Sequence, residues 1–473
     1  MAARLGAGIA GAAILIGAIT VLSRLVGFGR NLVFARTVGQ TCLGTAYFSA
    51  NQVPTIVFEI VVGGALTSIV VPVLAGPIAR GAFGDTRRIA SALLTWACLI
   101  LVPLTVVGFF VAGPVVALLV GEVRGCAPDQ VAAVGTRMLL VFLPQLVLYG
   151  IAVVLYGVLQ AHRRFLAPAL APLVSSIVVI AAYLAFVPFG GGRQNDLARL
   201  PGEAELILSV GTTLGVAALV LTAGVPAVRL GLRLRPTLSF PAGVAVRVRR
   251  LALAGVATVA AQQLAAVAVI VLANGYGGRG ALPLYTYAWA LYLVPYAVLA
   301  LPIATSSFPA LSARADAGDD HGFAGTMAPT TRAVVLVSFA AAGILAAVAS
   351  PTARVFVLGG PGDADPLQLQ AAVAAFAPGL VGYGLVAHVS RALYAAGRGR
   401  AAGTSVVAGW AVVILADVVL VRYVPPEWVV AALGLGNTVG MTVGGALLLA
   451  SLYRARGRDA LAGLGRAAAA GLL

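Results

Sequence analysis

Long apolar stretches, separated by short polar connections, repeat along the whole chain. Each stretch has at least the roughly 20 residues that an α-helix needs to cross the hydrocarbon core of a bilayer. A helix satisfies its own backbone polar groups in that core, where no water is available. The pattern therefore predicts an all-α polytopic membrane protein with twelve spans, at residues 7–37, 43–76, 86–120, 130–161, 165–189, 203–230, 242–275, 282–312, 325–358, 365–396, 401–424 and 427–453.

Arginine is concentrated in the connections that follow the even-numbered spans. Connections after odd-numbered spans contain fewer arginines and include acids such as Glu122 and Asp363. Under the positive-inside rule, this asymmetry places the arginine-rich connections and both termini in the cytoplasm. The arginines either set this topology alone or, above all in the linker 229–250, also recruit anionic lipid headgroups. The arginine-rich connections carry Arg80, Arg87, Arg88, Arg163, Arg164, Arg229, Arg233, Arg235, Arg247, Arg249, Arg250, Arg398, Arg400, Arg454, Arg456 and Arg458.

Two segments of the chain repeat each other in register. The segment "FLPQLVLYGIAVVLYGVLQAHRR" begins at Phe142, and "FAPGLVGYGLVAHVSRALYAAGR" begins at Phe376. A shorter echo pairs the sequence from Val53 with that from Val294. We therefore expect two pseudo-symmetric six-helix lobes of the same topology around a central cavity, a parallel repeat of the kind found in transporters. The predicted lobes are residues 1–235 and 236–455, followed by a short basic cytoplasmic tail at 456–473.

The composition excludes several classes of function. Hydrophobic residues make up 61% of the 473 positions and charged residues 10%, far from the values of soluble globular proteins. The net charge of +16 comes from arginine alone, because the sequence contains no lysine. A Walker A loop and a Schiff-base lysine are therefore both excluded. The three histidines form no ligand pair and the three cysteines no CxxC. We expect no metal site, no cofactor, no enzyme activity and no nucleic-acid partner.

The segment "SRLVGFGRNLVFAR" places charges inside the first span. An arginine at the bilayer centre costs ~2.5–3.5 kcal/mol on insertion scales, so Arg24 and Arg30 require compensation. On an ideal helix Arg24 and Asn31 share a face, whereas Arg30 lies about 120° away. The two glycines between the arginines weaken the helix, and a bend there would bring the guanidinium groups together.

The second span carries a polar stripe that offers this compensation. Gln52, Thr55 and Glu59 follow helical spacing, and the stripe continues to Thr67. One interpretation is a buried ion pair between Glu59 and an arginine that joins the first two helices. The other is a hydrated cavity in which Arg24, Arg30 and the stripe contact an anionic substrate.

Further polar and aromatic side chains lie in the second half. Gln262 gives the seventh span a polar edge, while Trp289 and Tyr292 belong to a helical series that starts at Tyr285 and ends at Tyr296. Aromatic faces and amides suit sugar rings or an aromatic packing seam equally well.

Three more polar residues lie within predicted spans, namely His388, Arg391 and Asp417. Intramembrane ionisable residues either pair with each other or mark ion pathways. An Arg391–Asp417 pair that ties two helices together is one interpretation, and coupling to an ion is the other.

Taken together, "SRLVGFGRNLVFAR", "GGALTSIVVPVL" and "FLPQLVLYG" followed by "LQAHRRFLAPALAPL" closely resemble the MurJ/MviN family. These are lipid II flippases of the multidrug/oligosaccharidyl-lipid/polysaccharide exporter superfamily. The resemblance covers all twelve spans. It implies two lobes around a cationic cavity, alternating access, and outward movement of undecaprenyl-diphosphate-linked disaccharide pentapeptide across the bacterial cytoplasmic membrane for peptidoglycan synthesis.

The resemblance can be followed residue by residue. Arg24 and Arg30 match family arginines that line the cavity, and Asn31 stands where an aspartate is common. Glu59 and Ala290 stand where many members have further arginines. The family usually has two more helices that form a groove for the lipid tail, whereas only a short segment follows the last span here. We expect a truncated or divergent form.

The resemblance also implies a driving force. Moving one negative charge outward across an inside-negative membrane gains ~2.3 kcal/mol per 100 mV, so the membrane potential or a coupling ion would suffice without ATP. The expected partners are lipid II, membrane lipids and cell-wall synthesis proteins, and the expected state is a monomer. The alternatives are a flippase for another polyprenyl-linked glycan and a non-transporting relative that scaffolds cell-wall synthesis.

Overall fold

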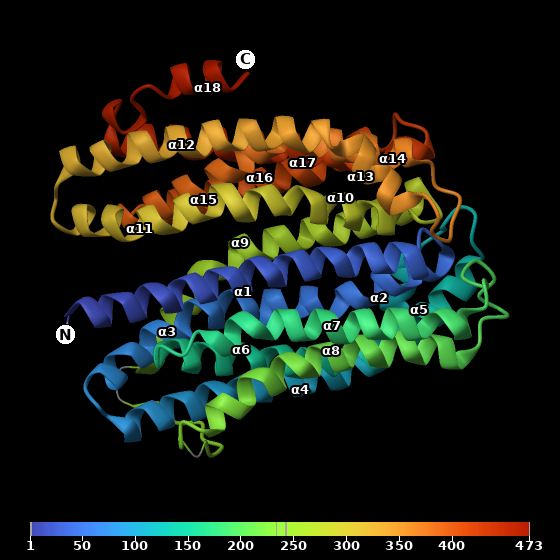
Figure 1. The fold of residues 1–473 in the computed structure, drawn as a ribbon, viewed down its shortest axis with the longest axis horizontal. Coiled ribbons are helices and arrows are strands. Elements are labelled where there is room, and N and C mark those ends of the chain that lie inside the picture. The colour runs from blue at the N-terminus through green and yellow to red at the C-terminus, as the bar shows by residue number, and fades with distance from the viewer. Residues whose placement is uncertain (1, 233, 242–243, 473) are drawn as a thin grey trace. The chain divides into compact units, whose positions relative to one another are not determined.

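The computed structural model describes residues 2–232, 234–241 and 244–472, and within them every regular element is helical (Figure 1). Side chains at 2–14, 62–69 and 245–255 are not part of this description. The predicted stripe residue Thr67 and four linker arginines, Arg233, Arg247, Arg249 and Arg250, therefore lie outside it. The all-α fold class predicted from the apolar runs is confirmed.

Ten helices among the described residues are long and apolar enough to cross a membrane, or eleven if a helix pair bent by 42° counts as one span. Eleven of the predicted spans coincide with these helices. The remaining prediction, 43–76, includes the undescribed side chains at 62–69, and its described part overlaps the shorter apolar helix Val70–Ala79. Twelve spans therefore agree approximately with the structure.

The helices gather into two units, Met1–Leu118 with Pro128–Val259, and Leu119–Ala127 with Ala260–Leu473. The first unit extends past residue 235, where the sequence-based boundary was placed, because Phe240 and Val244 pack against its hydrophobic core. The second unit includes a short connection from the first half of the sequence.

The first unit contains α1 to α8 and the first half of α9. Its core consists of side chains such as Val154 and Val158 of one helix with Leu93 and Leu101 of another. Proline lies inside several of these helices, which bend or break where it removes a backbone donor. The elements are α1 (Ala2–Thr37), α2 (Cys42–Phe58), the π-helical turn η1 (Glu59–Gly63), α3 (Gly64–Ala79), α4 (Phe83–Val120), α5 (Pro128–Phe142), α6 (Gln145–Ala161), α7 (Leu166–Gly190), α8 (Gly202–Val228) and α9 (Val244–Leu272).

The second unit begins within α9 and contains the remaining elements. Small residues bring α16 and α17 close together, because a Cβ on Gly440 would lie 2.7 Å from the backbone nitrogen of Val413. The elements are the π-helical turn η2 (Ala273–Gly277), α10 (Ala281–Pro295), the π-helical turn η3 (Tyr296–Ala300), α11 (Leu301–Asp316), α12 (Asp320–Ala347), α13 (Ala349–Val357), α14 (Pro366–Phe376), α15 (Gly379–Ala395), α16 (Gly399–Leu420), the 3-10 turn η4 (Pro426–Trp428), α17 (Val429–Arg456), the 3-10 turn η5 (Asp459–Leu461) and α18 (Leu464–Leu472).

The repeated sequence segments adopt the same local structure. In each, a helix stops at the repeated phenylalanine, a proline follows two residues later, and a second helix begins directly after it. The break separates α5 from α6 and α14 from α15. The second span of each unit is likewise interrupted by a π-helical turn, η1 or η3.

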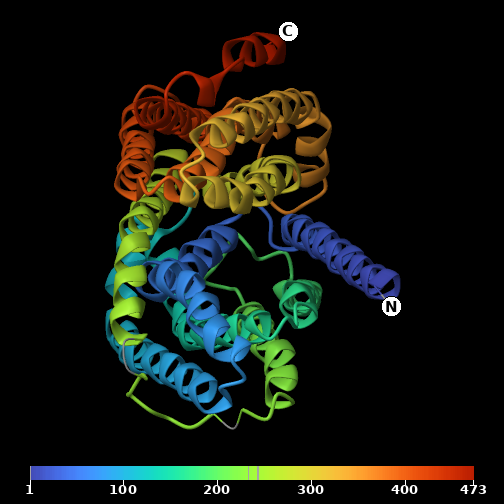
Figure 2. The same cartoon turned by 90° about the vertical axis from the view of Figure 1, so that its left-hand side faces the viewer.

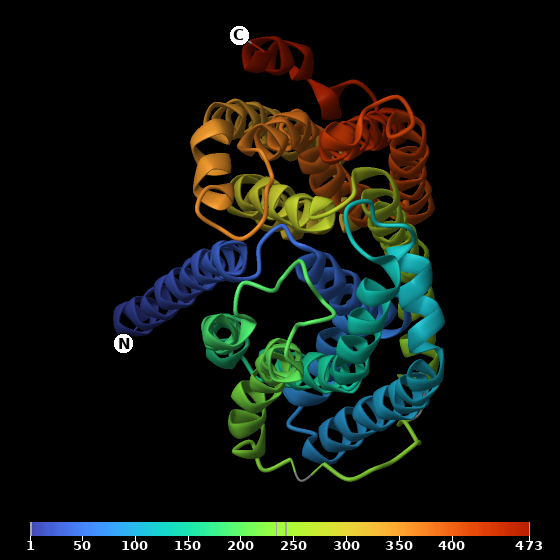
Figure 3. The ribbon, with the colours of Figure 1, turned by 90° about the vertical axis from the view of Figure 1, so that its right-hand side faces the viewer.

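Two peripheral segments are ordered. The predicted tail forms η5 and α18, and α18 packs along α12 in the second unit (Figure 1). In the first unit, the described part of the linker after α8 leads past the beginning of α4 as an extended segment without regular secondary structure, visible in yellow-green in Figures 2 and 3. We call the described residues 229–232 and 234–241 of this linker the strap.

Candidate functional site

The predicted arginine helix α1 is continuous through both glycines. Arg24 is exposed, whereas Arg30 and Asn31 are half-buried. The helix is fixed against α7, because the Ser23 hydroxyl donates to the carbonyl of Ala169 at 3.1 Å. This contact holds α1 two turns before Arg30.

Tyr149 of α6 is the residue around which the predicted first-half site assembles. Its side chain is hydrogen-bonded to Thr55, and the charges of Arg30 and Glu59 both act on it. The Tyr149 ring also packs on Phe58 with centroids 5.4 Å apart. Thr55 therefore contacts a tyrosine that sequence reasoning missed, and the charges of Arg30 and Glu59 act on the same tyrosine. A signal was present, since Tyr149 occupies the same place in its repeat as Tyr383 in the other.

A buried hydroxyl network extends this site. The Tyr47 hydroxyl lies 2.8 Å from the hydroxyl of Tyr183 and 2.8 Å from Oγ1 of Thr212. The charge of Arg30 also acts on Tyr47. Phe34 packs against both tyrosine rings with centroid distances of 5.0 and 5.1 Å. The charge of Arg30 thus acts on both Tyr47 and Tyr149, and both hydroxyls have hydrogen-bond partners.

Glu59 does not form the predicted ion pair in this conformation. It is half-buried at the first residue of η1, and no carboxylate–guanidinium pair involving it occurs among the described residues. The described ion pairs lie elsewhere. They are Arg137–Glu205, Arg199–Asp196, Arg279–Asp363 and Arg456–Asp320. Gln52, two turns before Glu59 on the predicted stripe, is half-buried.

The aromatic series of the second unit forms a packed seam around Phe376. The rings of Tyr285, Trp289 and Tyr292 lie 5.6, 5.9 and 5.2 Å from that of Phe376. Tyr292 is 0% exposed, and Trp289 and Gln262 are half-buried. The packing-seam interpretation therefore describes this conformation, and contact with sugar rings stays a prediction.

The predicted Arg391–Asp417 pair is wrong. The Arg391 guanidinium donates to the carbonyl of Ala387 on its own helix at 2.6 Å. Asp417 is 1% exposed, and neither carboxylate oxygen has a hydrogen-bond partner among the described residues. Side-chain partners depend on how two helices rotate against each other, and here Asp417 lies against the backbone of Gly436, where a Cβ would not fit.

His388 occupies a separate polar contact in the second unit. Its Nε2 lies 3.2 Å from Oγ1 of Thr330, and its Nδ1 lies 3.5 Å from Oγ of Ser307. The ring is fully buried between α11, α12 and α15. His388 and Asp417 therefore have different surroundings. No group of three or more His, Cys, Asp or Glu side chains suited to a metal occurs within the described ranges.

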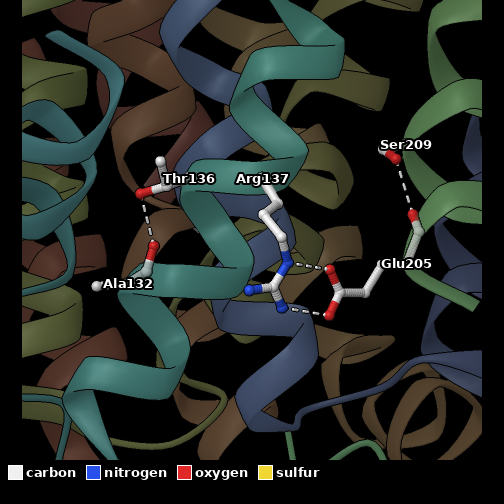
Figure 4. Close-up of polar contacts among 5 residues, drawn as sticks. All are labelled: Ala132, Thr136, Arg137, Glu205 and Ser209. Atoms are coloured by element: carbon white, nitrogen blue, oxygen red, sulfur yellow. Dashed lines mark hydrogen bonds and ion pairs between the residues drawn. The ribbon is translucent and has the colours of Figure 1, made fainter. Parts of the chain in front are cut away.

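Sequence reasoning also missed an ion pair that joins α5 to α8 (Figure 4). Arg137 donates from Nε and Nη2 to the two carboxylate oxygens of Glu205, at 2.8 and 2.6 Å. The Glu205 side chain is 8% exposed and that of Arg137 is 56% exposed. The available signal was an arginine in one apolar segment and a glutamate in another, which favours pairing.

Comparison with known proteins places this geometry in a family. The family model described as "Lipid II flippase MurJ" matches residues 34–470. The match begins after Arg24 and Arg30. Lipid II flippase MurJ of Burkholderia cenocepacia is 25% identical over 396 residues, covering 80% of this chain and 72% of that protein. Probable lipid II flippase MurJ of Vibrio cholerae is 24% identical over 382 residues, covering 79% and 70%.

Solved structures show the same fold. A lipid II flippase MurJ in an inward closed conformation superposes with a TM-score of 0.75 at 19% identity, covering 97% of this chain and 91% of that one. An inward-facing multidrug resistance MATE family transporter of the MOP superfamily also gives 0.75, at 14% identity, with coverage of 96% and 99%. Both likenesses concern the fold.

Proposed function

The chain belongs to the family of lipid II flippases MurJ, and on that premise we propose that it moves lipid II from the inner to the outer leaflet of the cytoplasmic membrane. The family is a transporter family rather than a family of catalytic enzymes. The ten or eleven apolar spans of the described residues suit a multi-pass carrier. In this proposal the arginine-rich connections and both termini face the cytoplasm, following the positive-inside rule.

The observation that carries the proposal is the setting of Arg30 in the first unit. Its charge acts on Tyr47 and Tyr149, and Tyr149 is hydrogen-bonded to Thr55. A guanidinium presents a planar set of donors that matches two oxygens of one phosphate, and hydroxyls supply further donors. No acidic partner neutralises Arg30 within the described residues. We infer that Arg30, with Arg24 on the same helix, binds the diphosphate of the lipid-linked substrate.

The proposed driving force is the membrane potential. Arginines that neutralise the diphosphate make the loaded carrier nearly uncharged, whereas the empty carrier is cationic and is drawn towards the negative cytoplasm. The potential supplies ~2.3 kcal/mol per charge and 100 mV. A coupling ion is the alternative, and the buried, unpartnered carboxylate of Asp417 is where we propose that it acts. The protein works as a monomer in this scheme, with alternating access provided by its two repeats.

The test is transport in reconstituted vesicles that contain labelled lipid II. An inside-negative potential, defined from the face that bears the arginine-rich connections, should accelerate flipping by the unmodified protein. Arg30→Ala should abolish this response, because it removes the charge. Tyr149→Phe should only weaken the response, because it removes a single hydroxyl. Glu59→Ala should retain more transport than Arg30→Ala. It removes a negative charge near Tyr149, whereas Arg30→Ala removes the positive charge that binds the diphosphate. Arg199→Ala is the matched control, because this arginine is 81% exposed in a surface pair.

Three outcomes would separate the alternatives. Flipping that is insensitive to Arg30→Ala, in protein that is folded and present at normal levels, would remove the proposed phosphate contact. Failure of the chain to restore growth to flippase-depleted cells, together with retained binding to cell-wall synthesis proteins, would favour the scaffolding alternative. Flipping of another polyprenyl-linked glycan but not of lipid II would change the substrate and leave the mechanism in place.

A further inference from the structure

One arginine in the first unit adopts a backbone conformation that L-residues rarely adopt. Arg163 has φ of 59° and is the one non-glycine residue with positive φ in the described part of the chain. It lies in the turn that ends α6, where its N–H donates to Gln160 and that of Arg164 donates to Leu159, at 2.9 and 2.8 Å. Such left-handed conformations at the end of a helix are normally supplied by glycine.

The second repeat contains the same turn with the expected residue. Gly397 occupies the place of Arg163 and has φ of 71°. Its N–H donates to Tyr394 at 3.1 Å, and that of Arg398 donates to Leu393 at 2.8 Å. The backbone of both turns therefore requires a left-handed residue. The second repeat avoids this strain by using glycine. The strain at Arg163 therefore indicates that its side chain has a role.

The surroundings of Arg163 show what that role requires. Ile78, Ala161 and Leu230 pack against one hydrophobic cluster of the first unit, which brings together the ends of α3, α6 and α8. Each end continues into exposed arginines, and Asp85 is the one acid in these segments. We call this surface the arginine face. Its described members are Arg80, Arg87, Arg88, Arg163, Arg164, Arg229 and Arg235.

The strap contributes to the arginine face because it is fixed to α4. The N–H groups of Arg235 and Thr237 donate to the hydroxyls of Ser91 and Thr95, both at 3.1 Å. These hydroxyls lie one helical turn apart and therefore match alternate donors of an extended strand. Arg88 closes the contact by donating to the Ser239 hydroxyl at 2.8 Å.

Apolar side chains lie beside these arginines. Trp96 of α4 donates to the carbonyl of Leu238 at 3.1 Å, and both side chains are exposed. Phe83, at the first position of α4, is 75% exposed. Exposed aromatic and aliphatic side chains next to arginines are typical of segments that lie at a membrane interface.

At the corresponding end of the second unit, two arginines have partners within the protein. Arg456 forms an ion pair with Asp320 and lies over the ring of Phe323. Arg314 donates to the carbonyl of Gly322. Acids are therefore available to neutralise arginines in the second unit, whereas the arginine face presents a surplus of positive charge.

We propose that the arginine face binds the phosphate headgroups of anionic phospholipids in the adjacent leaflet, and that Arg163 is retained at a strained position for this contact. The surplus of arginines favours an anionic partner. The exposed apolar side chains of Trp96, Leu238 and Phe83 beside them favour an anion that carries acyl chains, which is a phospholipid. The proposal concerns regulation by bulk lipid and does not depend on which substrate the protein transports.

The test measures binding of phosphatidylglycerol to the full-length protein in a neutral detergent, with phosphatidylcholine and inorganic phosphate as separate arms. Arg163→Gly should weaken phosphatidylglycerol binding about fivefold, the loss expected for one arginine at an anionic surface. It should leave phosphatidylcholine binding unchanged and should not lower thermal stability, because glycine relieves the strain. Arg163→Lys, which keeps the charge, should bind as the unmodified protein does. Arg398→Ala, at the equivalent of Arg164, is the matched control and should have no effect.

Three results would overturn the proposal. Equal phosphatidylglycerol binding by Arg163→Gly and the unmodified protein would remove the role of Arg163. An equal loss in Arg398→Ala would indicate a general effect of charge rather than a surface on the first unit. Competition by inorganic phosphate at the concentration at which phosphatidylglycerol binds would indicate a free-anion site. Lipid II flipping, measured in parallel, reports on the proposed transport separately.

Discussion

The ion pair between Arg137 and Glu205 allows a stability prediction to be worked out from its geometry. Arg137→Ala removes two charge-assisted hydrogen bonds and leaves a carboxylate whose side chain is 8% exposed. Breaking a fully buried pair costs about 3–5 kcal/mol, whereas exposed pairs contribute about 0–1 kcal/mol. Because the Arg137 side chain is 56% exposed, its charge is partly screened by solvent. We therefore expect a loss of about 2 kcal/mol, between these limits.

The two partners should behave asymmetrically. Glu205→Ala leaves a guanidinium that is already more than half exposed and can rotate into solvent. Its cost should be about 1 kcal/mol, roughly half that of Arg137→Ala. The double variant should cost less than the sum of the two single ones, because both remove the same pair. Arg199→Ala provides the control, since the Arg199–Asp196 pair is longer, at 3.7 Å, and exposed on both sides.

The assay is SDS-induced unfolding in mixed micelles, followed by circular dichroism, for the two single variants, the double variant and the control. The free energy of unfolding at a common detergent composition gives the coupling energy between the two residues. The prediction would be refuted if Glu205→Ala proved as destabilising as Arg137→Ala, because unequal burial would then not determine the cost of each variant. It would also be refuted if the two losses were additive.

Three further predictions concern other contacts. Gly440→Val should destabilise the second unit by more than about 2 kcal/mol, because a side chain would meet the backbone of α16; the same unfolding assay checks this, and wild-type stability would contradict it. Tyr47→Phe should cost about 1 kcal/mol, since it removes the Tyr47 hydroxyl that bonds to those of Tyr183 and Thr212; a stabilised variant would refute the network. Asp417→Asn should raise thermal stability, because it replaces an unpartnered buried carboxylate by a neutral amide; a lowered melting temperature would show that the charge is compensated.

The helices themselves could be predicted from the sequence because the length of an apolar run is a local property. The runs around α4, α7 and α16 exceed the length of a span and end at glycine or charged residues, so each boundary depends on nearby residues alone. The repeated Phe-x-Pro likewise predicts equivalent local structure at Phe142 and Phe376, since proline acts on its own turn.

Side-chain partners were harder to predict because they depend on how helices rotate against each other. Arg391 and Asp417 have complementary charges, yet Arg391 bonds to its own helix and Asp417 lies against Gly436. Helical spacing predicts that Thr55 and Glu59 share a face, but spacing within a helix cannot identify Tyr149 of α6, to which Thr55 is hydrogen-bonded. The partner of Arg137 is 68 residues away for the same reason.

The π-helical turn η1 has a consequence for comparing this chain with its relatives. A π-helical turn contains one residue more than the α-helical turn that it replaces, so every position after it is rotated by about 100° relative to an uninterrupted helix. A polar stripe predicted from a regular helical repeat therefore cannot keep the same helical phase beyond η1. A relative that lacks η1 would align through this helix only with a one-residue gap near Glu59. An ungapped alignment would look continuous in sequence. It would nevertheless match each residue after the turn with a residue on a different face of the helix. The same shift applies after η3 in the second repeat. Insertion of a single residue at either turn would therefore preserve the span but change which side chains lie on each of its faces.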